Sequence, residues 1–193
     1  MELKTFSDYQ KKALETNTYP DDKGLLLVAI GLGEEFGELI EKLYQNRDLY
    51  IVTENPINGC HFQINMDKKA ELIELIKKEI GDVFWYLAMN IYYLNVENDF
   101  IICTAETNNL DIDIFSYCFS GAYFKYLGLI KKRFRDNLKN DKKCKCFLKY
   151  LYANLLAICC LFNFNIKEVL ELNIKKLADR KKRGKIQGNG DNR

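Results

Sequence analysis

Proline and histidine are nearly missing from this chain of 193 residues, which has only two prolines and one histidine. Pro20 and Pro56 both lie between periodic segments, so the sequence favours long helices. An excess of charge of one sign is missing as well, since the formal net charge is only +2. Such a charge creates no overall field that would indicate a nucleic-acid or membrane partner.

Long hydrophobic runs are also absent. The N-terminal segment Met1–Lys4 lacks the apolar core of a signal peptide. Apolar runs such as Leu25–Ile30 are far too short to span a bilayer. We therefore expect a cytoplasmic protein with no membrane partner.

The seven cysteines are an odd number at irregular spacing, which is typical of free thiols in a reducing compartment. Cys144 and Cys146 stand one residue apart, as in some zinc sites. No second pair matches them, and His61 is the only histidine. We therefore interpret the cysteines as free thiols, several of them small buried hydrophobes, rather than as zinc ligands.

The apolar periodicity predicts at least five helices joined by polar connections. The expected helical segments are 7–15, 24–45, 67–94, 115–137, 146–162 and 166–183. Residues 55–59 form a turn cluster, 137–143 a solvated loop and 184–193 an irregular tail. No alternating pattern indicates a sheet. The sequence thus predicts one all-α domain over residues 1–193, built as a helical bundle.

Acidic residues flank the apolar stripe of the helix expected at 24–45. On a helical wheel with Leu32 as the origin, Glu35 lies at about −60° and Glu38 at about −120°. Glu34 and Glu41 fall nearly opposite the stripe, toward solvent. The stripe consists of Val28, Leu32, Phe36, Leu39 and Leu43.

The helix expected at 67–94 repeats this arrangement. With Ile76 as the origin, Glu79 lies at about −60° and Asp82 at about −120°. If the two helices pack antiparallel, the four carboxylates converge at the rim of the bundle, where they repel one another unless a cation binds. A set of ligands that consists of Glu and Asp, with no histidine or cysteine, suits Mg²⁺ or Mn²⁺ rather than zinc. A solvated pair of helix faces is the alternative to this metal site. The stripe consists of Leu72, Ile76, Ile80, Val83 and Leu87.

The segments Gly31–Leu39 and Lys78–Leu87 resemble the MazG-like nucleotide pyrophosphohydrolases. This superfamily of all-α NTP hydrolases also includes the dimeric all-α dUTPases. Its signature is Glu-Glu-x-x-Glu, followed by Glu-x-x-Asp on the next helix. Two outer segments are similar as well, Tyr9–Ala13 and 173–193, so that four ordered blocks cover about 110 residues. The signature positions in this chain are Glu34, Glu35, Glu38, Glu79 and Asp82.

The resemblance implies a Mg²⁺-dependent hydrolase that cleaves a nucleoside or deoxynucleoside triphosphate to the monophosphate and pyrophosphate. It implies that a metal-bound or glutamate-activated water attacks the α-phosphorus. Glu34, Glu35 and Glu38 would be catalytic, with Glu34 as the general base by its place in the motif, although the wheel turns Glu34 toward solvent. The implied metal ligands are Glu35, Glu38, Glu79 and Asp82.

The resemblance also implies a set of substrate-binding residues and a homo-oligomer, with a dimer as the expected state. Basic residues of the last helix would meet the phosphates, and Tyr86, or less directly Trp85, would stack on the base. From the residues alone, the alternatives are a solvated basic face and core packing of the aromatic rings. The implied binding residues are Tyr86, Asn173, Lys176, Arg180 and Arg183.

The chain departs from the family before its last helix, where about fifty to seventy additional residues intervene. Residues 126–134 resemble 36–44, and 148–164 parallel 78–96, with Phe147 and Tyr150 in place of Glu79 and Asp82. Residues 97–150 are therefore either a helical insertion that covers the site or an inactive second hairpin. Such a hairpin would complete the four-helix bundle that small relatives obtain from a partner subunit.

Two other functions stay open at this point. One is a catalytically inactive relative that binds nucleotides or a partner protein. The other is a helical nucleic-acid binder that uses the basic segment 175–183, which predicts salt-sensitive DNA binding. The intact set of acids favours the hydrolase over an inactive relative. The small net charge gives little support to a nucleic-acid binder.

Overall fold

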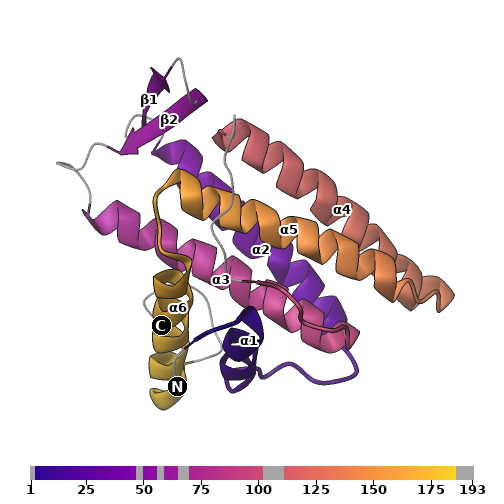
Figure 1. Cartoon of the computed structure of the whole chain (residues 1–193). Coiled ribbons are helices and arrows are strands. Elements are labelled where there is room, and N and C mark those ends of the chain that lie inside the picture. Colours follow the sequence, from indigo (N-terminus) through magenta and orange to yellow (C-terminus); the bar gives the residue numbers. More distant parts are fainter. Residues whose placement is uncertain (1–2, 47–49, 56–58, 65–69, 102–110, 186–193) are drawn as a thin grey trace.

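A computed structural model describes residues 3–46, 50–55, 59–64, 70–101 and 111–185 of the chain; for 50–55, 59–64 and 70–71 it describes the backbone alone. Within these residues the body of the protein is all-α, with six helices (Figure 1). The buried apolar side chains of all six belong to one hydrophobic cluster. The helices are α1 (Phe6–Leu14), α2 (Gly24–Gln45), α3 (Ala70–Leu94), α4 (Ile112–Asp136), α5 (Asp141–Leu161) and α6 (Ile166–Lys182).

Four of these helices form a bundle of two hairpins. Helix α2 packs along α3, and α4 packs along α5; the second hairpin then lies on the first, with α4 against α2 and α5 against α3. Helices α1 and α6 pack against α3, so that α3 is the central helix. The described helices of one chain therefore complete a four-helix bundle.

Both predicted apolar stripes are buried. The stripe residues of α2 are between 0% and 7% exposed, and those of α3 likewise. A Cβ atom on Gly31 would lie 2.1 Å from the ring of Tyr86, and one on Gly24 would lie 2.2 Å from the ring of Tyr93. These two glycines let α3 approach α2 closely, and their order along the chain shows that the helices run antiparallel.

A buried amide joins three helices of the bundle. Asn90 on α3 is 0% exposed. Its Nδ2 donates to the carbonyl oxygen of Val28 on α2 at 2.9 Å, and its Oδ1 accepts from the hydroxyl of Tyr126 on α4 at 2.6 Å. Because a buried polar group is costly unless it is bonded, these contacts favour one relative placement of the helices.

The second hairpin begins and ends differently from the sequence expectation. Helix α4 begins at Ile112 rather than near 115, because Asp111 caps it by accepting from the backbone N–H of Ile114 at 2.7 Å. It ends at Asp136, and the C-cap residue Asn137 is left-handed with φ of 54°. Helix α5 begins at Asp141, which pairs with Arg133. The connection is therefore 137–140, shorter than the expected loop at 137–143.

One local feature differs from the expectation of no sheet. The connection between α2 and α3 contains two strands, β1 (Tyr50–Asn55) and β2 (Gly59–Ile64), paired antiparallel (Figure 1). Their sequences, YIVTEN and GCHFQI, are rich in β-branched and aromatic residues, which favour extended backbone. Among the described residues each strand pairs only with the other. The centre of the predicted turn cluster, 56–58, lies outside the described residues.

Helix α5 is the single described helix that is long and apolar enough to cross a membrane by length and composition, with a mean hydropathy of 1.4. Half of that window is buried inside the structure. Leu148, Leu151 and Leu155 are all 0% exposed within the bundle. These properties are also those of a core helix.

Candidate functional site

Three carboxylates from two helices meet at one edge of the α2–α3 pair. One oxygen from each of Glu35, Glu79 and Asp82 lies within 4.8 Å of the other two. Glu79 is 1% exposed and Asp82 is 9% exposed. The three-residue spacing on α3 places both of its acids on the same flank of the apolar stripe, as predicted. The described structure thus contains a cluster of acids at the predicted place.

The acids strongly affect the protonation of Glu35. Its pKa is raised from 4.5 to about 8, first because burial removes water from the carboxylate, and then because Asp82, Glu38 and Glu79 are negative. Lys176 acts in the opposite direction. Added positive charge near these carboxylates would therefore stabilise the ionised form of Glu35.

Two lysines pair with the two acids of α3. Lys42 on α2 forms an ion pair with Glu79, and Lys176 on α6 forms one with Asp82. Lys176 was a predicted phosphate-binding residue. Lys42 was missed, although its wheel position at about −80° from Leu32 lies between those of Glu35 and Glu38. The cluster is therefore surrounded by cationic side chains from two different helices.

Asn173 on α6 is a second partner of Asp82. Its Nδ2 donates to Oδ1 of Asp82 at 2.8 Å, and its Oδ1 accepts from the hydroxyl of Tyr9 on α1 at 2.8 Å. A Cβ atom on Gly81 would lie 2.9 Å from Cβ of Asn173, so this glycine lets α6 approach α3 closely. Asn173 thus contacts the acid cluster directly, and Tyr9 positions it.

The other two glutamates of the motif lie toward solvent. Glu34 and Glu38 are both exposed. The exposure of Glu34 agrees with its predicted place on the wheel. Glu38 does not belong to the group of three whose oxygens lie within 4.8 Å of one another, although its charge raises the pKa of Glu35. The structure thus brings together three of the four predicted metal ligands and leaves Glu38 beside them.

The two predicted stacking residues have different surroundings. Tyr86 is half-buried on α3, and its hydroxyl lies 2.9 Å from the hydroxyl of Tyr19. Burial and this hydrogen bond raise the pKa of Tyr86. Trp85 is 8% exposed, and its Nε1 donates to Oγ1 of Thr16 at 3.0 Å. Trp85 therefore packs against the segment after α1, and only Tyr86 adjoins the acid-bearing face.

The two predicted arginines also differ. Arg180 is 3% exposed and lies one turn beyond Lys176 on the same side of α6. Arg183 follows the end of α6 and pairs with Asp179, with its Nη2 2.7 Å from the carboxylate. Among the described contacts, Lys176 pairs with an acid of the cluster, whereas Arg183 pairs with a residue of its own helix.

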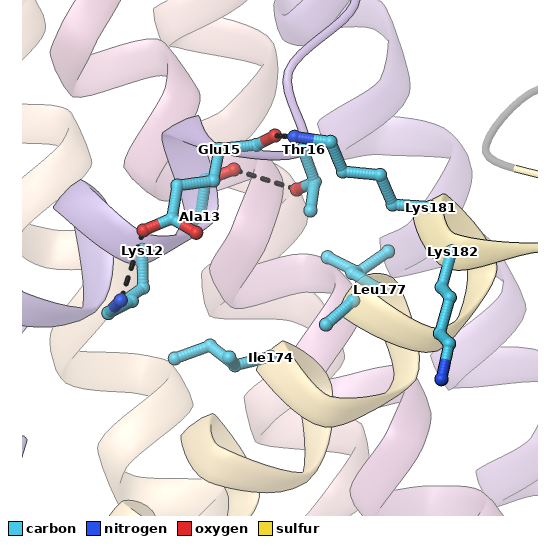
Figure 2. Close-up of a pocket in the computed structure, with 9 residues that line it drawn as sticks. Lys12, Ala13, Glu15, Thr16, Ile174, Leu177, Lys181 and Lys182 are labelled. Atoms are coloured by element: carbon cyan, nitrogen blue, oxygen red, sulfur yellow. Dashed lines mark hydrogen bonds and ion pairs between the residues drawn. The ribbon is translucent and has the colours of Figure 1, made fainter. Parts of the chain in front are cut away.

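A cavity of about 240 Å³ lies between α1 and α6, apart from the acids. Figure 2 shows Ile174 and Leu177 along it, with Lys181 reaching across to the backbone oxygen of Glu15 at 2.6 Å. None of the three clustered acids lines it. We therefore assign the candidate site to the acid cluster, where the charged groups converge, and not to this cavity.

Comparisons with models of protein families, with curated proteins and with solved structures found no match for this chain.

Proposed function

We propose that this protein is a Mg²⁺-dependent nucleoside triphosphate pyrophosphohydrolase of the MazG-like all-α type, which converts a (deoxy)nucleoside triphosphate to the monophosphate and pyrophosphate. The observation that carries this proposal is the convergence of Glu35, Glu79 and Asp82 from two antiparallel helices, with their oxygens within 4.8 Å of one another. The resemblance of the two acid-bearing segments to that superfamily supplies the reaction.

The donor set fits a hard divalent cation. Mg²⁺ binds oxygen at about 2.1 Å in an octahedron, so neighbouring ligand oxygens are about 3 Å apart and opposite ones about 4.2 Å. The three clustered oxygens are near this range and come without histidine or cysteine, as Mg²⁺ or Mn²⁺ prefers. Glu38 is the proposed fourth ligand, because it lies one turn beyond Glu35 on the same flank of α2.

A bound cation would clamp the phosphates, neutralise developing negative charge and lower the pKa of water. The residues of the chain would then have separate tasks. Lys42 and Lys176, relieved of their acids by the cation, would offer their charges to phosphate oxygens. Asn173 would hold Asp82 in one orientation, and the ring of Tyr86 would contact the base. Glu34 remains the proposed general base by its place in the motif.

A second function is supported by a specific observation. Glu79 and Asp82 each already have a lysine partner, Lys42 and Lys176 respectively. In such a cluster the two ammonium groups take the place of a catalytic cation, and their remaining N–H groups can donate to a nucleotide phosphate. The second candidate is therefore a nucleotide-binding protein without turnover.

Product analysis separates the two functions. Purified protein is incubated with each NTP and dNTP and Mg²⁺, and monophosphate and pyrophosphate are quantified. The hydrolase produces both in equal amounts and only when the metal is present. The binding protein produces neither, while its unfolding temperature rises with nucleotide. Glu35→Gln should abolish turnover with the helical content retained. Glu41→Gln, the same change on the exposed face of α2, is the matched control and should retain it.

A further inference from the structure

Positive charge is concentrated around the turn that joins α4 to α5. Residues 131–143 contain seven basic residues and two acids, a net charge of +5, whereas the rest of the chain has a net charge of −3. The expectation of no membrane partner rests on the small net charge of the whole chain, which averages over this difference. We call residues 131–143 the basic tip. Its basic residues are Lys131, Lys132, Arg133, Arg135, Lys139, Lys142 and Lys143.

The basic tip projects from one end of the bundle. The hydroxyl of Tyr123 on α4 donates to the carbonyl oxygen of Ala29 on α2 at 3.0 Å, and Phe36 stacks on Phe119, so these two helices run antiparallel. From the contact at Ala29, α2 extends only five residues further to its beginning, whereas α4 continues for 13 residues to its end. The end of α4 therefore lies about 12 Å beyond the beginning of α2. Figure 1 shows the turn between α4 and α5 beyond the ends of α2 and α3.

The lysines of the basic tip differ from its arginines. Arg133 pairs with Asp141, and Arg135 pairs with Asp136, so both acids of the tip already have an arginine partner. Among the described residues no ion pair involves the other five basic residues, which are all exposed: Lys131, Lys132, Lys139, Lys142 and Lys143. Their charges are therefore available to an anion from outside the chain.

Two apolar side chains lie among these lysines. Phe134 is 48% exposed and Leu138 is 51% exposed. Leu138 follows the left-handed Asn137, and its backbone N–H donates to the carbonyl oxygen of Lys132 at 3.4 Å, which closes the end of α4 and fixes Leu138 there. Single exposed apolar residues are ordinary, but an aromatic and an aliphatic side chain among lysines at a projecting end combine apolar insertion with electrostatic attraction.

The composition of the basic tip favours a membrane surface over a nucleic acid. Arginine is the residue that recognises single phosphates through two parallel hydrogen bonds, and both arginines here are occupied by carboxylates. Lysine is a compact point charge, which suits a surface with many negative groups. Leu138 has no ring on which a base could stack, whereas its exposed side chain can enter lipid.

We propose that the basic tip binds the surface of a membrane that contains anionic lipids. The lysines attract the negative headgroups, while Phe134 and Leu138 enter the boundary between the headgroups and the acyl chains. Each lysine near such a surface strengthens binding by about fivefold, so several of them together give reversible binding. Salt weakens this binding because it screens the charges. The proposal does not rest on nucleotide turnover, and its test does not measure turnover.

Flotation of the full chain with lipid vesicles measures this binding. The protein should float with vesicles of phosphatidylcholine that contain about a quarter phosphatidylserine, and should not float with phosphatidylcholine alone. Lys139→Gln/Lys142→Gln/Lys143→Gln should weaken binding about a hundredfold. Lys175→Gln/Lys182→Gln/Lys185→Gln removes the same charge from exposed lysines in and after α6, and should leave binding nearly unchanged. A wild-type protein that does not float, or an equal loss in both variants, would overturn the proposal.

The two apolar residues are tested by fluorescence. With the anionic vesicles, the emission of Leu138→Trp should shift to shorter wavelength and be quenched by lipids with brominated acyl chains. The native Trp85 is 8% exposed, so the wild-type protein should show neither change. An unshifted and unquenched emission of Leu138→Trp in the floated protein would rule out insertion and reject the proposal.

Phe134→Ser/Leu138→Ser should weaken flotation about tenfold with the helical content retained. The matched control is Leu75→Ser/Tyr92→Ser, which changes exposed apolar residues of α3 and should float as the wild type does. If the two variants float equally well, Phe134 and Leu138 do not contact lipid.

A gel-shift assay with duplex DNA and with single-stranded RNA examines the competing partner. At physiological salt neither should bind as tightly as the anionic vesicles do. Binding of either nucleic acid that is as tight as vesicle binding, and that is lost in Lys139→Gln/Lys142→Gln/Lys143→Gln, would assign the basic tip to nucleic acid instead of a membrane.

Discussion

Asn173 donates to Oδ1 of Asp82 at 2.8 Å and thereby joins α6 to the acid cluster on α3. The same amide accepts from the hydroxyl of Tyr9, so three helices meet at one buried side chain that is 1% exposed. The C-terminal helix is therefore part of the candidate site and not only its neighbour.

Replacing Asn173 with leucine should lower the free energy of unfolding by about 1–3 kcal/mol, because buried oxygens of Asp82 and Tyr9 lose their partner. Tyr9→Phe removes one hydroxyl and should cost about 1 kcal/mol. The double variant should lose less than the sum, since both changes remove the same hydrogen bond. Urea unfolding measures all three. Strict additivity would show that the two side chains do not act together.

Lys42→Met tests whether a cation can replace an ammonium group at the cluster. Glu79 is 1% exposed, so removing its lysine should lower the free energy of unfolding of the metal-free protein by about 3 kcal/mol. Mg²⁺ should restore most of this loss, and calorimetry should show tighter Mn²⁺ binding than in the wild type, because the lysine no longer competes.

The matched control for that experiment is Lys77→Met on α3. Lys77 pairs at 3.9 Å with Glu168, whose side chain is 64% exposed. An exposed pair of this kind contributes about 1 kcal/mol or less, and Mg²⁺ should not compensate for its loss. If Mg²⁺ restored the free energy of unfolding of neither variant, Glu79 would not be a metal ligand.

Helix α2 shows how much of the fold can be predicted from the sequence. Its predicted range, 24–45, is the range found, and its five predicted stripe residues are buried. A long amphipathic helix carries this information locally, because every turn repeats the same apolar pattern. The hairpin β1–β2 has no such repetition, and within the described residues its strands pair only with each other, so the sequence did not predict the strands.

The candidate site was predictable in its residues but less so in its pairings. Wheel positions place Glu35, Glu38 and Lys42 on one flank of α2. The pairing of Lys42 with Glu79 depends on the antiparallel register of α2 and α3, which the close contact of Gly31 with Tyr86 helps to set. Register is a property of two helices, and the periodicity of either one alone does not contain it.

The metal-free protein should lose stability as the pH rises from about 5 to 8. The pKa of Glu35 is raised from 4.5 to about 8, so the folded protein keeps a proton that the unfolded chain releases. Between these values the folded state binds more protons, and the free energy of unfolding falls with rising pH. Burial of the carboxylate is the first cause of this raised pKa; the negative charges of Asp82, Glu38 and Glu79 add to it, and Lys176 opposes it.

Urea unfolding at pH 5.5 and at pH 8.5, in the presence of a chelator, measures this pH dependence. Glu35→Gln should flatten it, because the amide does not titrate. Adding Mg²⁺ at pH 8.5 should recover the lost stability if the cation binds the ionised cluster. Stability that instead increased over this range would show that Glu35 is ionised throughout in the folded protein.

Two glycines of α2 should respond to alanine in opposite directions. A Cβ atom on Gly31 would lie 2.1 Å from the ring of Tyr86, so Gly31→Ala displaces that ring and should lower the free energy of unfolding by about 1–3 kcal/mol. A Cβ atom on Gly37 would meet nothing within 4 Å, so Gly37→Ala should raise the free energy of unfolding by up to about 1 kcal/mol.

If Tyr86 contacts the base, Gly31→Ala raises KM with kcat nearly unchanged, because displacing a ring that only binds the base weakens substrate binding without altering the chemical step. A fall in kcat alone would instead place Tyr86 beside the reacting phosphate.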